Sequence, residues 1–164
     1  MTDTRLCAPH LRQPSWGGVL AMSLAAFVLV ASEFMPVSLL TPMAEGLDAS
    51  VGQTGQAVSI SGLFAVIASL AVSTVAGRLN RKWVLIGLTG LMGVSLVLVA
   101  AAPNFEVLMG GRAVLGLCIG GFWALATSVI MRLVPASDVP RALVLMYGGQ
   151  AIAAAFAAPI GSYF

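Results

Sequence analysis

Long apolar runs separated by short polar segments make up almost the whole chain. Each run carries one charged residue or none. Each is also long enough to cross a bilayer, whose hydrocarbon core of about 30 Å takes about 20 helical residues. The pattern predicts an all-α membrane fold, in which a polar tail of residues 1–15 precedes a transmembrane bundle of residues 16–164. The five predicted spans cover residues 16–40, 51–76, 83–102, 107–131 and 141–164.

The composition supports a membrane location and narrows the classes of function. Of the 164 residues, 59% are hydrophobic and only 9% are charged, whereas soluble domains carry about 25% charged residues. The lipid bilayer is therefore the expected surrounding of the chain. The net charge of +2 is spread over loops, so no nucleic-acid partner is expected. Cys7 and Cys118 have no metal-ligand spacing, and no nucleophile–base motif or phosphate loop suggests an enzyme.

The loops between the spans differ in charge. If the spans alternate in direction, every Lys and Arg of the loops and tail falls on one side of the membrane. Cytoplasmic loops carry an excess of these residues, so the N-terminus is predicted to be cytoplasmic. The cations on this side are Arg5, Arg12, Arg78, Arg81, Lys82, Arg132 and Arg141, whereas the opposite loops carry Glu45, Asp48 and Glu106.

Glu33 and Arg112 lie inside predicted spans. A charge near the bilayer centre costs about 2.5–3.5 kcal/mol on insertion scales, and such residues usually face a protein interior or a water-filled cavity. At 1.5 Å per residue, both lie about 7–10 Å from the outer ends of their spans, so we expect them to be partners. Two interpretations remain open. The pair holds two spans together, or one or both residues line a transport cavity, with the proton as coupling ion and no other cofactor.

The 107–131 span has a stripe of residues that favours a cavity-facing surface. Trp123 offers a flat stacking surface and an N–H donor, which suits a planar, polar ligand. A packing seam of small residues, namely Gly116, Gly120, Ala124 and Ser128, is the alternative for the glycines. In the last span, Gln150 is predicted to face a cavity or to hydrogen-bond a neighbouring helix. The stripe, within about 80° of arc at 100° per residue, contains Arg112, Gly116, Gly120, Trp123 and Thr127.

Four stretches of the chain resemble bacterial major facilitator superfamily transporters of the drug:proton antiporter type. The resemblance is closest to exporters of purine ribonucleosides, and it implies export of inosine and guanosine in exchange for protons across the bacterial inner membrane. It also implies a central cavity lined by the first, fourth, seventh and tenth helices, which includes Glu33 and Arg112. The stretches are ASEFMPVSLLTPMA (31–44), RLNRKWVL (78–85), GRAVLGLCIGGFWALATSVIMRLVP (111–135) and AAPIGS (157–162).

The resemblance assigns a gating role to the basic loop that contains Gly77, Arg78, Arg81 and Lys82. The superfamily pattern places an acid in this loop, whereas here Asn80 lies among the cations.

The superfamily has twelve helices in two six-helix halves, and this chain ends within the fifth. We therefore expect a fragment or truncated reading frame whose C-terminal half is missing, and which does not transport its small-molecule substrate alone. The alternatives are a sugar or drug exporter of the same superfamily and a membrane scaffold or regulatory subunit without transport.

Overall fold

The computed structural model describes residues 14–38, 50–75 and 80–163, and these residues form an all-α fold with no strand. All five helices are long and apolar enough to span a membrane. Helix α4 begins at Arg81, two residues before the predicted span, and α5 extends two residues beyond each predicted end. The helices are α1 (Trp16–Ser38), α3 (Val51–Val75), α4 (Arg81–Ala100), α5 (Phe105–Leu133) and α6 (Val139–Tyr163).

Two asparagine side chains mark where helices begin. The side-chain oxygen of Asn80 accepts a hydrogen bond from the backbone N–H of Lys82 at 3.1 Å, at the start of α4. Asn104 accepts a hydrogen bond from the N–H of Val107 at 2.9 Å, at the start of α5. Each asparagine satisfies a backbone donor that the first helical turn leaves without a partner. Arg81 and Lys82, predicted to belong to a loop, therefore lie in the first turn of α4.

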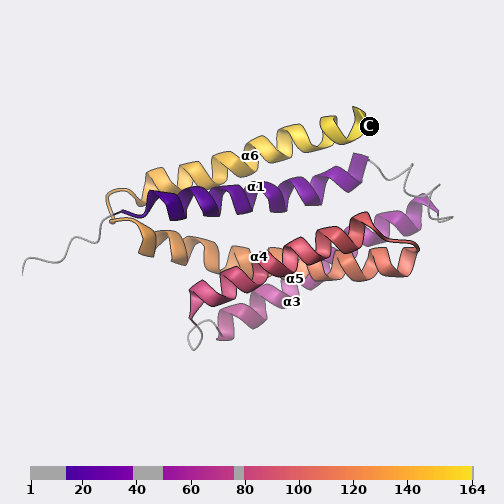
Figure 1. Cartoon of the computed structure of the whole chain (residues 1–164), viewed down its shortest axis with the longest axis horizontal. Helices are drawn as coiled ribbons and strands as arrows, with labels where there is room; N and C mark the ends of the chain where they lie inside the picture. Colours follow the sequence, from indigo (N-terminus) through magenta and orange to yellow (C-terminus); the bar gives the residue numbers. More distant parts are fainter. Residues whose placement is uncertain (1–13, 39–49, 76–79, 164) are drawn as a thin grey trace, which may run out of the picture.

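The bundle joins the paired helices α1 and α6 on one side to α3, α4 and α5 on the other (Figure 1). Helix α1 packs against α6 along its length, while α3 and α4 both pack against α5. The α5 residues Leu115, Cys118, Phe122, Ala126 and Ile130 are almost fully buried. Helix α5 contacts each of the other described helices, most extensively α3 and α4, so its buried side chains are positioned by several neighbours.

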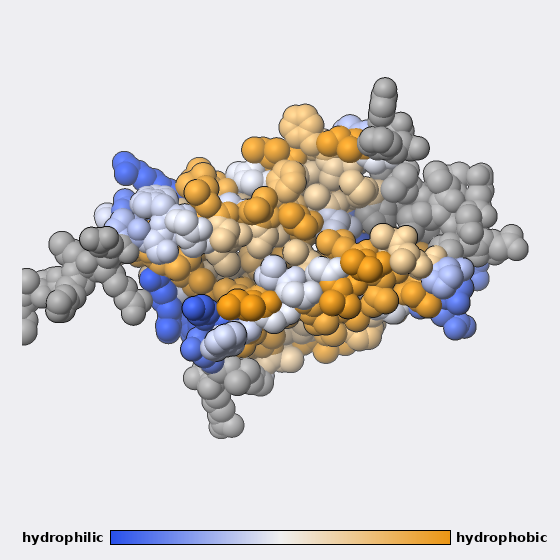
Figure 2. All heavy atoms as spheres, viewed as in Figure 1, coloured by the Kyte–Doolittle hydropathy of each residue, from blue (hydrophilic) through white to orange (hydrophobic). Residues whose placement is uncertain are grey.

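The outer surface of the bundle is apolar. Orange side chains cover much of the face in Figure 2, whereas the blue ones gather at the two ends of the bundle. An apolar belt between polar ends is the surface that a bilayer requires of a membrane-spanning bundle. The chain is therefore a multi-pass membrane protein. Large exposed residues of this belt include Leu24, Leu63, Leu70, Val97 and Val144.

Two glycines of α5 bring its backbone into contact with α3. A Cβ atom added at Gly116 would lie 2.9 Å from the carbonyl carbon of Ser61, and one added at Gly120 would lie 2.7 Å from that of Ala65. Both glycines are therefore packing residues, because small residues let two helices approach closely in lipid. The cavity-facing interpretation is wrong for these two glycines, and the packing seam is the correct alternative for them.

Candidate functional site

Glu33 of α1 and Arg112 of α5 lie side by side. Atom Nη2 of Arg112 is 3.6 Å from Oε1 of Glu33. The Arg112 side chain is 1% exposed and the Glu33 side chain is 28% exposed. The structure thus brings together the two charges inside the predicted spans, one of them enclosed by protein and the other partly open.

Three uncharged oxygens hold the guanidinium of Arg112. Its Nε donates to the carbonyl oxygen of Ala57, and its Nη1 donates to the carbonyl oxygen of Ser32, each at 3.2 Å. Its Nη2 donates to Oγ of Ser61, also at 3.2 Å. The separation of 3.6 Å from Glu33 is longer than a charge-assisted hydrogen bond of about 2.7–2.9 Å. None of the three hydrogen bonds of Arg112 is therefore made to Glu33.

Ser61 of α3 connects the two charged residues. Its hydroxyl oxygen lies 3.0 Å from Oε1 of Glu33 and accepts the hydrogen bond from Arg112, and its side chain is fully buried. Sequence reasoning missed this residue. The hydroxyls of Ser59, Ser69 and Ser73 on the same helix bond carbonyls of their own helix. No sequence signal separates Ser61 from these serines, because only tertiary packing selects the one that meets a neighbouring helix.

The two carboxylate oxygens of Glu33 have different surroundings. Oε1 lies near Ser61 and Arg112. Oε2 is buried and has no hydrogen-bond partner among the described residues. A buried polar atom without a partner is rare in folded proteins and points to strain, function or a bound species. This asymmetry sets Glu33 apart as a chemically unusual group.

A cavity of about 220 Å³ lies beside this cluster, with walls from four helices. Glu33, Ser61, Trp123 and Gln150 give it its polar edges. That Trp123 and Gln150 meet a substrate there stays a prediction. Arg112 does not line the cavity, because it is buried among backbone carbonyls. Thr127 is half-buried and also lies outside the lining. The apolar lining comes from Leu29, Val30, Phe34, Gly62, Ala65 and Ile119.

Aromatic rings continue this polar edge toward α6. The rings of Trp123 and Tyr147 are stacked, with centroids 6.0 Å apart and an angle of 8° between their planes. The ring of Phe122 meets Trp123 edge-on at 5.5 Å. Tyr147 is 47% exposed, so the stack reaches the surface of the described bundle. Tyr147 was not singled out in the sequence.

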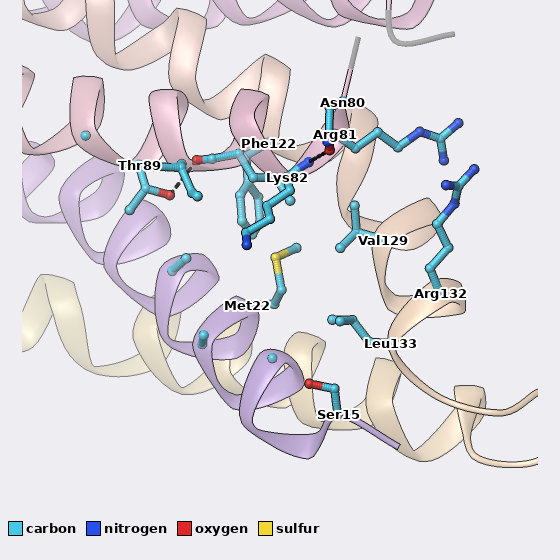
Figure 3. A pocket seen from close by; sticks show the side chains of 16 residues that line it. Ser15, Met22, Asn80, Arg81, Lys82, Thr89, Phe122, Val129, Arg132 and Leu133 are labelled. Atoms are coloured by element: carbon cyan, nitrogen blue, oxygen red, sulfur yellow. Dashed lines mark hydrogen bonds between the residues drawn. The ribbon is translucent and has the colours of Figure 1, made fainter. Parts of the chain in front are cut away.

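A larger cavity of about 1260 Å³ lies near the start of α4 and the ends of α1 and α5. Figure 3 shows Lys82 reaching toward its interior, while the side chains of Arg81 and Arg132 extend beside each other at one edge. Of the predicted gating residues, Gly77 and Arg78 lie outside the described residues. The described ones, Arg81 and Lys82, line this larger cavity, and neither lines the smaller cavity beside Glu33.

The described part of the chain offers no obvious metal centre. No group of three His, Cys, Asp or Glu side chains there is arranged to hold a metal ion. Cys118 is a free, buried thiol in the apolar core. The described site residues offer a carboxyl group, a guanidinium, a hydroxyl, an amide and an aromatic ring.

The described apolar helices, with an acid and a base inside them, define a polytopic membrane protein. The Major Facilitator Superfamily profile matches residues 22–164, and the chain belongs to this superfamily. It is 58% identical over 149 residues to the "Transcription regulatory protein OpdE" of Pseudomonas aeruginosa. This alignment covers 91% of this chain and 37% of that protein.

Other relatives carry the name "Purine ribonucleoside efflux pump NepI". The chain is 41% identical over 156 residues to the protein of Salmonella paratyphi B and 42% identical over 156 residues to that of Shigella dysenteriae. These alignments cover 95% of this chain and 39% and 40% of the two relatives. The chain thus spans about two fifths of the length of the curated relatives that it matches.

Proposed function

We propose that this chain forms the N-terminal part of a proton-coupled efflux transporter, with purine ribonucleosides as its first-choice substrates. The observation that carries the proposal is the position of Glu33, which borders the cavity of about 220 Å³ and has an oxygen without a partner among the described residues. The efflux function named for two of the relatives supports the class of activity.

Proton coupling requires a carboxyl group that changes charge without unfolding the helices around it. Glu33 meets this requirement because Arg112 donates its hydrogen bonds to two carbonyl oxygens and the Ser61 hydroxyl, and none of them to Glu33. A pair that only joined α1 to α5 would leave a buried cation without partners each time the acid was neutralised, which is strongly unfavourable. The arrangement favours proton exchange at Glu33 over the interpretation of a fixed ion pair.

The shape and polarity of the cavity favour a planar, polar substrate. Trp123, held against Tyr147, provides an aromatic ring in the lining, and Gln150 provides an amide with both donors and acceptors. A volume of about 220 Å³ is below the usual range for ligand pockets, about 300–1,000 Å³. A site completed by the remainder of a longer protein explains this small volume. A purine base with an attached ribose matches both the aromatic and the polar parts.

Regulation without transport is a second candidate function. The observation in its favour is the name of the Pseudomonas aeruginosa relative, which is 58% identical to this chain. In that case the same cavity would bind a small molecule and change the conformation of the bundle, and the change would be passed to a partner.

Vesicle transport separates these candidates. Everted vesicles would carry the 164-residue chain alone, or a fusion of this chain to the remaining part of the Salmonella efflux pump. We expect proton-driven accumulation of inosine with the fusion only, and its loss in the Glu33→Gln fusion. Preferential uptake of a sugar or an apolar drug would replace the nucleoside assignment.

A folded fusion that moves none of these compounds would refute the transport proposal and favour regulation. The 164-residue chain would contradict its proposed role as one part of the transporter if it transported inosine alone.

A further inference from the structure

The hydroxyl of Ser61 has more acceptors than it can serve. Its oxygen lies 3.0 Å from Oε1 of Glu33 and 2.8 Å from the carbonyl oxygen of Val58. The same oxygen already accepts the N–H of Arg112. A serine hydroxyl has one proton to donate, so only one of the two acceptors receives it at a time.

The charge of Glu33 decides between the two acceptors. An ionised carboxylate is the stronger acceptor, because hydrogen bonds to a charged oxygen are about twice as strong as those between neutral groups. A neutral carboxyl group loses this advantage. The nearby carbonyl oxygen of Val58 then accepts the hydrogen bond from the hydroxyl. The two acceptors belong to different helices, since Val58 lies in α3 and Glu33 lies in α1.

We propose that Ser61 is the positioning residue of the proton site. It donates to Oε1 of Glu33 in the ionised state and turns to the carbonyl of Val58 when Glu33 takes up a proton. This inference rests on the proposed proton exchange at Glu33. The proton binds at Oε2, because Oε1 faces the donors of Ser61 and Arg112 whereas Oε2 has no described partner. The balance is simple: one proton and one carboxylate give one carboxyl group.

The described surroundings of Glu33 contain one other charged group, Arg112 of α5. Helix α3 contributes Ser61, and α6 contributes Gln150 to the shared cavity; neither side chain titrates. Among the described residues, Ser61 is therefore the uncharged hydrogen-bond donor that favours the ionised state of Glu33 over the neutral state. Removing its hydroxyl removes the donor that stabilises the ionised state, whereas the loss of the acceptor for Arg112 is common to both states.

Carbodiimide labelling tests this role without any transport. The reagent reacts with protonated carboxyl groups in apolar surroundings, and peptide mass spectrometry reads its attachment at Glu33. Exposed Glu106 serves as the internal reference. The probe is dicyclohexylcarbodiimide at pH 7, applied to the purified chain in detergent micelles. We expect labelling of Glu33 to be about tenfold faster in Ser61→Ala, since a hydrogen bond to a charged group contributes at least that factor.

Two further variants distinguish positioning from packing. Ser61→Cys keeps the volume and a weaker donor, so we expect an intermediate labelling rate. Ser95→Ala is the matched control, because Ser95 is also fully buried and its hydroxyl donates to the carbonyl of Gly111 at 2.7 Å, away from Glu33. We expect this control to label like the unmodified chain. Thermal unfolding of every variant verifies that the bundle remains folded.

The outcomes separate this inference from the proposed function. Equal labelling of Ser61→Ala, Ser95→Ala and the unmodified chain would overturn the role of Ser61. Faster labelling in both alanine variants would also overturn it, because loosened packing would then be the cause. The expected labelling pattern, together with a folded fusion that transports nothing, would retain the Ser61–Glu33 coupling and reject transport.

In a fusion that does transport, Ser61→Ala should impair export in the Glu33 background and add no further loss to Glu33→Gln. Additive losses would show that Ser61 acts on another part of the molecule.

Discussion

The absence of a side chain at Gly116 lets α5 pack closely against α3 beside Ser61, so a substitution there should affect both the packing and the site. In Gly116→Ala, the new Cβ atom would lie 2.9 Å from both the carbonyl carbon and the Cα atom of Ser61. Ordinary contacts at such a position begin at 3.4 Å. The carbonyl oxygen of Ser61 lies closer still to the added atom. The backbone of α3 must therefore move by at least about 0.5 Å, the difference between these two distances, because the atoms that block the methyl group are not a flexible side chain.

The expected loss of stability follows from two opposing effects. Overpacking of a well-packed interface costs about 1–3 kcal/mol. Replacing a glycine inside a helix by alanine gains about 1 kcal/mol from helix propensity. Gly110→Ala is the matched control, since Gly110 lies in the same helix and a Cβ atom there meets nothing within 4 Å. The propensity gain is common to both variants, so their difference isolates the overpacking of about 1–3 kcal/mol.

The site should respond as well as the fold. The hydrogen bond from Arg112 to Ser61 is already 3.2 Å long. A displacement of Ser61 by about 0.5 Å away from α5 removes it. The same shift displaces the Ser61 hydroxyl that donates to Oε1 of Glu33. We therefore expect Gly116→Ala to label faster with carbodiimide at Glu33, whereas Gly110→Ala should not.

The assay is the free energy of unfolding in mixed micelles titrated with dodecyl sulfate and followed by tryptophan fluorescence. Gly116→Ala should be less stable than Gly110→Ala by the difference given above. Equal stabilities within about 0.5 kcal/mol, the usual scatter of surface substitutions, would refute the close contact between α3 and α5.

Three other substitutions test separate parts of the structure. Arg112→Lys should lower the free energy of unfolding by about 1–3 kcal/mol, because an ammonium group cannot reach all three oxygens and leaves a buried acceptor without a donor; unchanged unfolding in mixed micelles would contradict this contact set. Trp123→Ala in the transporting fusion should weaken inosine export at low substrate concentration more than Trp123→Phe, which keeps a ring; equal kinetics would remove Trp123 from the substrate site. Arg141→Gln should leave the unfolding titration unchanged, because its pairing with Asp138 is exposed and 3.7 Å long; clear destabilisation would show a contact beyond this pair.

The sequence alone was sufficient for the class of fold and for the central pair of the site. Five apolar runs predict five helices because a bilayer requires about 20 apolar residues per crossing and satisfies no free backbone groups. Glu33 and Arg112 stand out in these runs because a charge in lipid needs a partner or water. Their similar depth predicted the pairing that the structure shows at 3.6 Å. The cytoplasmic position of the N-terminus stays a prediction from loop charge.

Tertiary structure decided which face of each helix does what. Packing against α3 assigned Gly116 and Gly120 to the helix interface. It also buried Arg112 outside the cavity lining, and it brought Ser61, among several similar serines, to Arg112. The physical reason is that lipid is as apolar as the interior of the bundle. Hydropathy therefore does not distinguish a buried face from a lipid-facing one. The rotation of each helix about its axis is set instead by close contacts and hydrogen bonds between helices, which do not appear in the local pattern of the chain.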